Sequence, residues 1–371
     1  MQPRCRCALT ESTQACDVNF VSHTGRAPSP PTSMMLADHT TFRVGGPAKR
    51  FVEASTQDEL ILEVGGADAR GEPVLVLGGG SNMLVPDDGF DGTVVRVATR
   101  GVTAEVSSCG GAVVRAQAGE NWDELVSFAV EQGWVGVESL SGIPGSVGAT
   151  PIQNVGAYGA DVAATISAVR TWDRQLRQVR TFPVSACGFG YRTSVFKRTP
   201  GRWLILDVAF QFPLGDRSAP VAYPELARAL SVEVGQRSTT SEVRDAVLAI
   251  RRSKGMVLDE SDHDTWSGGS FFTNPLLSED EAASLPPEAP RFPSGDLIKT
   301  SAAWLIQNAG FPKGYGNDVA RLSSKHVLAL TNRGHAQASD LVRLAREVRD
   351  GVRARYGISL EPEVNLLGTT L

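Results

Sequence analysis

The spacing of apolar residues divides the chain into three successive blocks of mixed helix and strand. In the first block, Ser55 and Asp58 resemble a capping-box start for a helix that continues to about Ala69. A helix between two strands forms a β-α-β unit, so we expect the flanking strands to be parallel. The predicted strands of this block are 51–54, 74–77 and 93–97.

The second block alternates apolar and polar residues with the period of a half-buried sheet. Asn121 and Glu124 predict the start of a helix that ends near Gly133. Between residues 141 and 160 the chain is rich in glycine and follows no regular period. The predicted strands are 102–106, 112–118, 166–172, 176–182 and 203–212.

The third block contains most of the predicted helices. The longest covers about 339–356 and presents an apolar face made of Leu341, Leu344, Val348 and Val352. The other predicted elements are helices at 241–253 and 301–309, a proline-rich segment at 275–293, and strands at 326–330 and 358–366.

Together the blocks predict an α+β protein with three domains that follow an N-terminal tail. Residues 1–35 contain Pro28, Pro30 and Pro31 among serines and threonines and lack apolar periodicity, so we expect a disordered segment. The three domains are expected at 36–100, 101–215 and 216–371.

The composition narrows the class of protein. Of the 371 residues, 42% are hydrophobic and 21% charged, which is typical of a globular chain. The net charge of -5 gives no basic surface for nucleic acid, and no stretch approaches the ~20 apolar residues that span a membrane. Irregularly spaced cysteines favour a reducing cytoplasm, and Cys5 and Cys7 are too close for a metal knuckle. We expect a cytoplasmic monomer without a metal site.

The first candidate ligand site is a loop made of Gly78, Gly79, Gly80, Ser81 and Asn82. Consecutive glycines let backbone amides approach a phosphate closely. A tight turn between two strands explains the same pattern equally well. No helix follows the loop, which excludes the Rossmann fingerprint, and no Gly-Lys-Ser/Thr follows, which excludes a Walker loop.

A second candidate is the glycine-rich segment 141–160. Long irregular loops in compact domains are usually functional or disordered, and the apolar residues Ile152 and Val155 argue against disorder. Small residues with interleaved backbone donors suit contact with a flat ligand such as a flavin ring, and a buried crossover between sheets is the alternative. The candidate cofactor contacts are Ser141, Gly142, Ile143, Pro144, Gly145, Gly148, Asn154, Gly156 and Tyr158.

Three polar positions outside these segments are candidates for chemistry. Arg192 can bind a carboxylate through two parallel hydrogen bonds, although a lone arginine is more often a solvated surface residue. Ser270 lies between a glycine pair and two phenylalanines, which suits either ligand approach or a simple turn. Glu361 and Glu363 are expected on one face of a strand, where like charges need water, a cation or a function to compensate.

Taken together, these segments are similar to the UDP-N-acetylenolpyruvoylglucosamine reductases of bacterial peptidoglycan synthesis. The resemblance covers about residues 36–367. The long glycine segment combined with the serine and glutamate motifs is highly specific, whereas the triple glycine alone is not. The matching segments are TFRVGGPA at 41–48, VLGGGSNMLV at 76–85, SGIPGSVGATPIQNVGAYGAD at 141–161, GFGYRTSVFK at 188–197, RRSKGM at 251–256, GGSFFTNP at 268–275 and LEPEV at 360–364.

The resemblance implies two FAD-binding domains of the vanillyl-alcohol-oxidase type and a third domain that closes over a UDP-sugar. It also implies a reaction in which NADPH reduces FAD, and the reduced flavin passes hydride to an enolpyruvyl ether to give UDP-N-acetylmuramate. Hydride addition places negative charge beside the substrate carboxylate. Such a reaction needs an always-charged group such as arginine and a general acid.

The resemblance also implies roles for individual residues. Ser270 matches the proton donor, and Arg192 and Glu363 match the pair that handles the carboxylate and the enolate-like intermediate. An anion beside developing negative charge is unfavourable, so Glu363 is expected either to be protonated or to orient Arg192 or water. The implied substrate contacts are Tyr223 of the long-loop subgroup, Lys254 at a nucleotide phosphate, and Asn274.

Some points stay open after the resemblance. Thr273 and Asn365 stand where the family often has Lys and Arg, which affects how substrate or nicotinamide phosphate is held. An FAD-linked oxidase of the same fold and a UDP-sugar binding module without chemistry are the alternative functions. Neither 78–82 nor 141–160 contains His or Cys, so we expect noncovalent FAD. No residue distinguishes NADPH from NADH.

Overall fold

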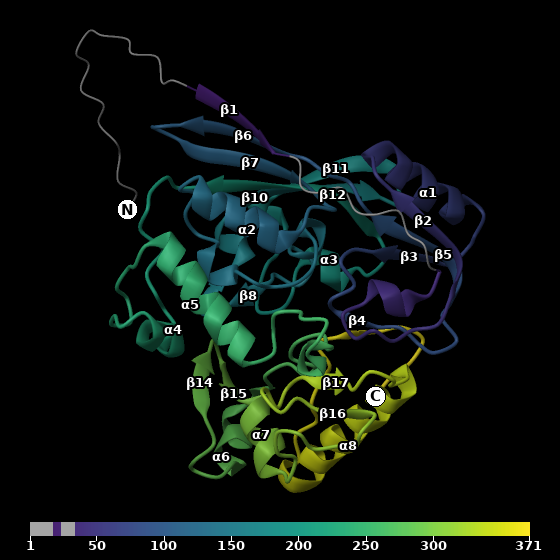
Figure 1. Ribbon diagram of the computed structural model, residues 1–371, viewed down its shortest axis with the longest axis vertical. Helices are drawn as coiled ribbons and strands as arrows, with labels where there is room; N and C mark the ends of the chain where they lie inside the picture. Colours follow the sequence, from purple (N-terminus) through teal and green to yellow (C-terminus); the bar gives the residue numbers. More distant parts are fainter. Residues whose placement is uncertain (1–17, 24–33) are drawn as a thin grey trace.

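The computed structural model of the chain describes residues 18–23 and 34–371 (Figure 1). A broad antiparallel sheet lies at one end of the molecule and a largely helical C-terminal part at the other (Figure 1). Most of the segment that we expect to be disordered, 1–17 and 24–33, lies outside the described residues. The three predicted domain boundaries stay predictions.

A three-stranded parallel sheet forms the first part of the chain. Its elements are β2 (Ala48–Ala54), α1 (Gln57–Ala69), β3 (Val74–Leu77) and β5 (Phe90–Val97). A short strand, β4 (Met83–Leu84), lies between β3 and β5 in the chain. The strands of the β-α-β unit are parallel as expected, with β5 between them. The predicted helix cap is wrong by one residue. Thr56 and Glu59 form the capping box, because the Thr56 side chain accepts the Glu59 N–H.

The middle of the chain forms a six-stranded antiparallel sheet in the order β1-β6-β7-β12-β10-β11. The strands are β1 (Val18–His23), β6 (Val102–Ser107), β7 (Gly111–Gln117), β10 (Ile166–Asp173), β11 (Gln178–Pro183) and β12 (Trp203–Phe212). Helix α2 (Trp122–Glu131) begins at the predicted cap, since Asn121 accepts the Glu124 N–H. Trp122 and Phe210 contribute to the hydrophobic core between helix and sheet. The predicted strands of this block are confirmed with small shifts of their ends.

The expectation that the whole tail is disordered is wrong for residues 18–23. These residues form β1, which pairs antiparallel with β6. The pairing satisfies backbone groups of β6 that would otherwise lie at an open sheet edge. His23 stacks on Phe128 of α2 at 4.7 Å between ring centroids. The strand depends on a partner more than seventy residues away, so the local pattern of the tail does not reveal it.

The C-terminal part combines helices with short strand pairs. Its elements are α4 (Pro224–Ala229), α5 (Thr240–Ser253), β13 (Leu276–Leu277), α6 (Glu279–Ser284), β14 (Arg291–Ser294), β15 (Leu297–Thr300), α7 (Ala302–Asn308), β16 (Ala320–Leu322), β17 (Leu330–Asn332) and α8 (Ala338–Tyr356). The predicted apolar face of α8 is confirmed, since Leu341, Leu344, Val348 and Val352 are all buried. The helix ends at Gly357, whose φ is 73°.

Two strand predictions in this part are wrong in their extent. The strand expected at 326–330 begins only at Leu330, because the Ser323 side chain holds the preceding residues in a turn. The strand expected at 358–366 is reduced to β18 (Asn365–Leu366), which pairs in parallel with β4. Pro362 has no N–H for a ladder and makes only an isolated bridge with Phe272. The last segment therefore returns to the first part of the chain as extended backbone.

Candidate functional site

The two glycine segments predicted from the sequence pack directly against each other. A Cβ atom added to Gly79 would lie 2.7 Å from Cα of Gly145, and one added to Gly78 would lie 2.6 Å from Oγ of Ser146. Gly80 has a φ of 61°, and a Cβ there would lie 1.9 Å from a backbone oxygen. A side chain therefore has no space at any of the three positions. Gly78 and Gly79 join the two segments, while Gly80 packs against the backbone of His39.

A cavity of about 220 Å³ opens beside this contact. It brings together the predicted catalytic residues Arg192, Ser270 and Glu363, which come from segments far apart in the sequence. Two short strands, β8 (Gly156–Ala157) and β9 (Ala160–Asp161), form a hairpin at its edge, and α3 (Val195–Arg198) follows Arg192. The predicted cofactor contacts in the lining are Ser81, Asn82, Ile143, Pro144 and Gly156.

The remaining predicted site residues are not part of the cavity lining. The side chain of Asn154 donates to the Gly190 carbonyl and accepts the Ala163 N–H, and its contact with a cofactor stays a prediction. The residues outside the lining are Gly78, Gly79, Gly80, Ser141, Gly142, Gly145, Gly148, Asn154, Tyr158, Tyr223, Lys254 and Asn274.

The predicted substrate contacts Tyr223 and Lys254 lie at the ends of two neighbouring helices. Tyr223 precedes α4, is 44% exposed, and packs edge-on against Tyr158 with 5.7 Å between ring centroids. Lys254 ends α5, and its Nζ lies 2.6 Å from Oε2 of Glu225. Asn274 has a structural contact, because its Oδ1 accepts the Ala302 N–H at the start of α7. The structure thus groups Tyr223 and Lys254 at α4, because the partner of Lys254 lies two residues after Tyr223.

Arg192 and Glu363 form an ion pair in the cavity. Nε of Arg192 lies 2.9 Å from Oε1 of Glu363, and the two side chains are 24% and 13% exposed. The contact is not a directed hydrogen bond, since this Nε has no hydrogen-bond partner. Nη2 of Arg192 donates to the Gly156 carbonyl at 2.9 Å. The φ of Arg192 is 52°, a conformation that is uncommon outside glycine and clusters at functional sites.

The groups around Glu363 determine how readily its carboxyl group is protonated. Burial raises the pKa of Glu363, while the charges of Arg192 and Lys197 oppose the shift. Lys197 also supports the arginine, since its Nζ donates to the Arg192 carbonyl at 3.1 Å. A carboxyl group with a raised pKa is protonated more readily. The geometry is therefore compatible with both expected roles of Glu363, a protonated acid and a group that orients Arg192.

Ser270 is placed by main-chain contacts on both sides of its loop. The Phe271 N–H donates to the Leu328 carbonyl at 2.8 Å, and the Phe271 carbonyl accepts the Glu363 N–H at 2.8 Å. A Cβ added to Gly268 would lie 2.6 Å from the ring of Phe42, so the glycine allows close packing. These contacts hold the Ser270 loop beside the segment that carries Glu363.

One cavity residue that the sequence interpretation missed is Arg251. Its side chain is 7% exposed, Nη2 donates to the Met256 carbonyl at 2.9 Å, and Nε has no hydrogen-bond partner. Burial lowers the pKa of Arg251, while Tyr158 and Asp123 act in the opposite direction. The motif RRSKGM was interpreted through Lys254 alone, although a buried unpaired donor is the stronger sign of a ligand.

The donor set of the cavity fits FAD. A buried N–H without a partner costs about 1–3 kcal/mol, and an oxygen of a bound cofactor would satisfy the Nε of Arg251. The side chains of Ser81 and Asn82 and the apolar Ile143 also face the cavity. A lining that combines polar and apolar groups suits a cofactor with a phosphate part and a flat ring.

Other kinds of site are not found in residues 18–23 and 34–371. Within these ranges no group of three His, Cys, Asp or Glu is arranged to hold a metal ion. No helix of the described chain is long and apolar enough to cross a bilayer. The described cysteines Cys109 and Cys187 do not line the cavity, and burial raises the pKa of Cys187 to about 11.

Comparison with known families agrees with this geometry. Residues 48–180 match the profile of an FAD binding domain, and residues 260–367 match the C-terminal domain of UDP-N-acetylenolpyruvoylglucosamine reductase. The fold and the cavity therefore define an FAD-dependent oxidoreductase.

Whole-chain relatives narrow this class to one family. A UDP-N-acetylenolpyruvoylglucosamine reductase from Cutibacterium acnes is 60% identical over 340 residues, covering 91% of this chain and 90% of that protein. One from Thermobifida fusca is 51% identical over 347 residues, covering 91% and 97%. The chain belongs to the UDP-N-acetylenolpyruvoylglucosamine reductase family.

A solved structure supports the fold independently. The crystal structure of the reductase from Thermus caldophilus superimposes with a TM-score of 0.61 at 24% sequence identity, covering 95% of this chain and 99% of that one. The α+β flavoprotein fold, the family and the FAD dependence predicted from the sequence are thereby confirmed.

Proposed function

We propose that this chain reduces UDP-N-acetyl-3-O-(1-carboxyvinyl)glucosamine to UDP-N-acetylmuramate, with NADPH as reductant and noncovalently held FAD. The observation that carries the proposal is the meeting of Arg192, Ser270 and Glu363 in one cavity that both glycine segments line. Relatives that bear the name of this reductase align over nearly their whole length. The proposed setting of this reaction is peptidoglycan precursor synthesis in the cytoplasm, with the chain acting as a monomer.

FAD, when bound, relays hydride from NADPH to the carbon–carbon double bond of the substrate. The residues that would hold it are Ser81, Asn82, Ile143 and Gly156 in the lining, and Arg251 would be an additional donor. Loop 78–82 and the glycine-rich segment keep these groups in place by their mutual packing.

Arg192 stabilises the negative charge that develops on the substrate. A guanidinium keeps its proton at physiological pH, so its charge is present at every stage of the reaction. Glu363 fixes the orientation of Arg192 through the ion pair. Because burial raises the pKa of Glu363, an approaching anionic carboxylate favours the neutral form of this residue further. The pair can therefore accept a negatively charged substrate without strong repulsion.

Ser270 donates the proton that completes the reduction. Hydride addition to the terminal carbon leaves negative charge on the neighbouring carbon, and a C–H bond forms there as the O–H bond of Ser270 breaks. The main-chain contacts of Phe271 to Leu328 and to Glu363 keep the hydroxyl beside the charge-stabilising pair. The proton donor and the arginine therefore act on the same substrate from one cavity.

Tyr223 and Lys254 bind the UDP part of the substrate. They lie near each other at the ends of α4 and α5, and Tyr158 connects Tyr223 to the glycine-rich segment. Lys254 already pairs with Glu225, so a nucleotide phosphate shares the ammonium group with that carboxylate. Asn274 contributes from the loop after Ser270, which its contact with α7 holds in place.

Product analysis tests the proposed reaction. Purified protein with NADPH and the enolpyruvyl sugar should form a product heavier by two hydrogen atoms, with one NADPH oxidised for each product molecule. UDP-N-acetylglucosamine, which lacks the double bond, is the matched control and should stay unchanged. Oxidation of NADPH without any mass change in the enolpyruvyl sugar would contradict the proposal.

The state of the cofactor is tested separately. Acid precipitation of the yellow protein should release all of the flavin into the supernatant as FAD. Flavin that stays in the precipitate would show covalent attachment. Protein that is colourless and cannot be reconstituted with FAD would support a binding module without chemistry.

A further inference from the structure

A histidine outside the cavity lining lies against the proposed proton donor. Nε2 of His326 is 3.5 Å from Oγ of Ser270. The two loops are neighbours because the Phe271 N–H donates to the Leu328 carbonyl. His326 does not itself line the cavity, so its route to a bound substrate passes through the Ser270 hydroxyl.

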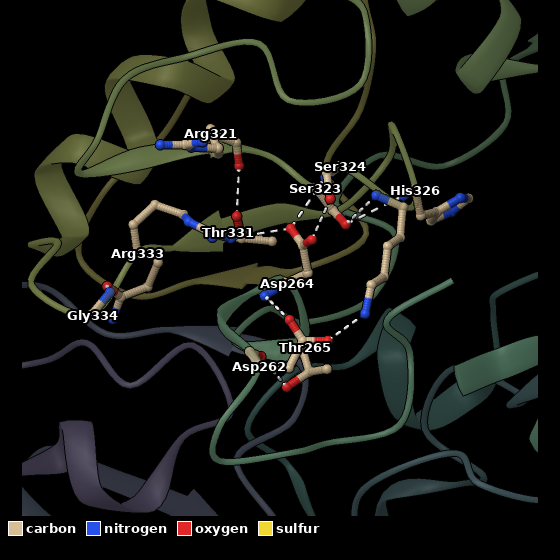
Figure 2. Close-up of polar contacts among 12 residues, drawn as sticks. Asp262, Asp264, Thr265, Arg321, Ser323, Ser324, His326, Thr331, Arg333 and Gly334 are labelled. Carbon is tan, nitrogen blue, oxygen red and sulfur yellow. Dashed lines mark hydrogen bonds and ion pairs between the residues drawn. The ribbon is translucent and has the colours of Figure 1, made fainter. Parts of the chain in front are cut away.

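The loop that carries His326 is fixed by the polar network shown in Figure 2. Oγ of the buried Ser323 accepts the N–H groups of Lys325 at 3.0 Å and of His326 at 3.3 Å. The carboxylate of Asp264 accepts the N–H of Ser324 at 3.1 Å. Each of these bonds restrains the backbone of 323–326, so the position of the imidazole is set by its own loop.

The same network also restrains the chain segment that precedes Ser270. Asp264 accepts a second hydrogen bond from Nη1 of Arg333 at 3.1 Å, and Lys325 pairs with Asp262 at 2.5 Å. Asp262 and Asp264 lie on the segment that leads directly into the Ser270 loop. A network that joins both loops restrains the positions of the hydroxyl and the imidazole relative to each other, and proton delivery depends on such positioning.

The ring of His326 is neutral at physiological pH. Burial lowers the pKa of His326 to about 4, the charges of Lys254, Lys313 and Arg251 act in the same direction, and only Glu225 opposes them. A neutral imidazole carries one N–H and one unprotonated nitrogen. When a serine gives its hydroxyl proton to a substrate, its oxygen becomes negatively charged. A hydrogen-bond donor beside that oxygen therefore helps the transfer, whereas an acceptor would compete for the proton.

We propose that His326 is a positioning residue for Ser270, and that its Nε2–H donates to the serine Oγ. The bond turns the hydroxyl proton toward the cavity. As the C–H bond of the product forms and the O–H bond of Ser270 breaks, the same N–H stabilises the alkoxide that remains. A water molecule then returns a proton to the serine oxygen, while the imidazole keeps its own proton throughout.

This inference rests on the proposed role of Ser270, and a double-mutant experiment on the FAD-loaded protein tests both separately. The variants are His326→Leu, His326→Gln, Ser270→Ala and the double variant Ser270→Ala/His326→Leu. Stopped-flow absorbance measures flavin reduction by NADPH and reoxidation by the enolpyruvyl sugar. His326→Leu should slow reoxidation roughly tenfold, the effect of one ordinary hydrogen bond, and leave reduction unchanged.

Two results distinguish positioning from a structural role. His326→Gln keeps an N–H donor of similar reach and should recover most of the rate. The double variant should be no slower than Ser270→Ala, because the histidine acts only through the serine. Flavin content and melting temperature are recorded for each variant. His335→Leu, the same change at an exposed histidine, should change neither half-reaction.

Several outcomes would overturn the inference. The two residues would act independently if the double variant reoxidised more slowly than Ser270→Ala by the same factor that His326→Leu alone causes. A normal reoxidation rate in His326→Leu, with Ser270→Ala slow, would remove the histidine and leave the serine in place. A normal rate in Ser270→Ala would overturn the proposed role of the serine and the inference with it.

Discussion

The six-stranded sheet and the loops around the cavity are held together by different kinds of contact. In the sheet, β12 pairs along its backbone with β10 on one side and with β7 on the other. In the loops, isolated main-chain bonds such as those of Phe271 are joined by contacts of individual side chains. Asp264 bonds with Ser324 and Arg333 in this way, and Arg192 pairs with Glu363.

The difference determines how each region responds to change. A backbone ladder is shared over many residues, so the loss of one side chain removes little of it. A loop that depends on one carboxylate or one hydroxyl loses its contact completely when that group is replaced. We therefore expect single substitutions to have their largest effects in the loops and their smallest effects at the sheet.

The largest effect is expected from Ser270→Ala. Positioned acid catalysis is typically worth about 10²–10⁴-fold, so reoxidation of the flavin by the enolpyruvyl sugar should slow by at least about a hundredfold. Reduction by NADPH needs no proton on carbon and should stay near normal. Stopped-flow absorbance measures both rates, with Ser339→Ala at an exposed serine as the control. Equal slowing of both half-reactions would point to binding or folding.

A smaller effect on the same cavity is expected from Lys254→Ala. Loss of one contact to a nucleotide phosphate should raise KM for the enolpyruvyl sugar about tenfold, which corresponds to about 1.4 kcal/mol. Flavin reduction by NADPH should be largely intact. Steady-state kinetics measures the change, with Lys49→Ala as the control because that exposed lysine also pairs with a carboxylate. An unchanged KM would remove Lys254 from the substrate site.

A third substitution breaks the loop network without touching the cavity. Asp264→Asn leaves Arg333 without its charged partner and weakens the bonds from Ser324, which should cost about 1–3 kcal/mol of unfolding free energy. Asp318→Asn, at an exposed aspartate that pairs with Arg321, should cost much less. Thermal and denaturant unfolding at neutral pH measure both changes. Equal stability of the two variants would contradict the account of the loops.

The cost of Asp264→Asn should depend on pH. Burial alone would raise the pKa of Asp264, but hydrogen bonds from Ser324 and the charge of Arg333 outweigh it and lower the pKa below 3.8. A folded-state pKa below the unfolded value contributes stability that is present above the unfolded pKa and is lost as pH falls through the folded pKa. The difference between wild type and variant should therefore be constant near neutral pH and shrink below about pH 3.8.

The smallest effect is expected at the sheet edge. Deletion of residues 1–23 removes β1 and exposes β6, which should lower the melting temperature by about 1–2 °C if the strand contributes about 1 kcal/mol. Deletion of residues 1–17 keeps β1 and is the matched control. Activity should be normal in both. A large loss of activity in the longer deletion would show that β1 supports the cavity.

Local patterns predicted the regular elements of the chain well. Period-two alternation located β6, β7, β10, β11 and β12, and the apolar face of α8 is buried as the spacing of its leucines and valines indicated. The apolar spacing and the capping residues that define these elements lie within short stretches of sequence. The capping box at Thr56 differs by one residue from the prediction because Ser55 and Thr56 offer the same kind of hydroxyl.

Contacts between distant segments were not predictable in the same way. The motifs identified Arg192, Ser270 and Glu363, but no spacing showed that the arginine and the glutamate pair directly. Arg251 and His326 were missed because their significance depends on burial and on neighbours supplied by other loops. Strand β1 was missed for the same reason, since its partner edge lies in another part of the chain.

The central claim is that the protein passes the hydride of NADPH, through FAD, to an enolpyruvyl sugar bound in the cavity. The direct measurement is an anaerobic flavin spectrum of the wild-type protein, bleached with one equivalent of NADPH and then mixed with the enolpyruvyl sugar. We predict that the sugar restores the yellow colour without oxygen and is recovered as the reduced product. Colour that returns only when oxygen is admitted, with the sugar unchanged, would contradict the account and favour an oxidase of the same fold.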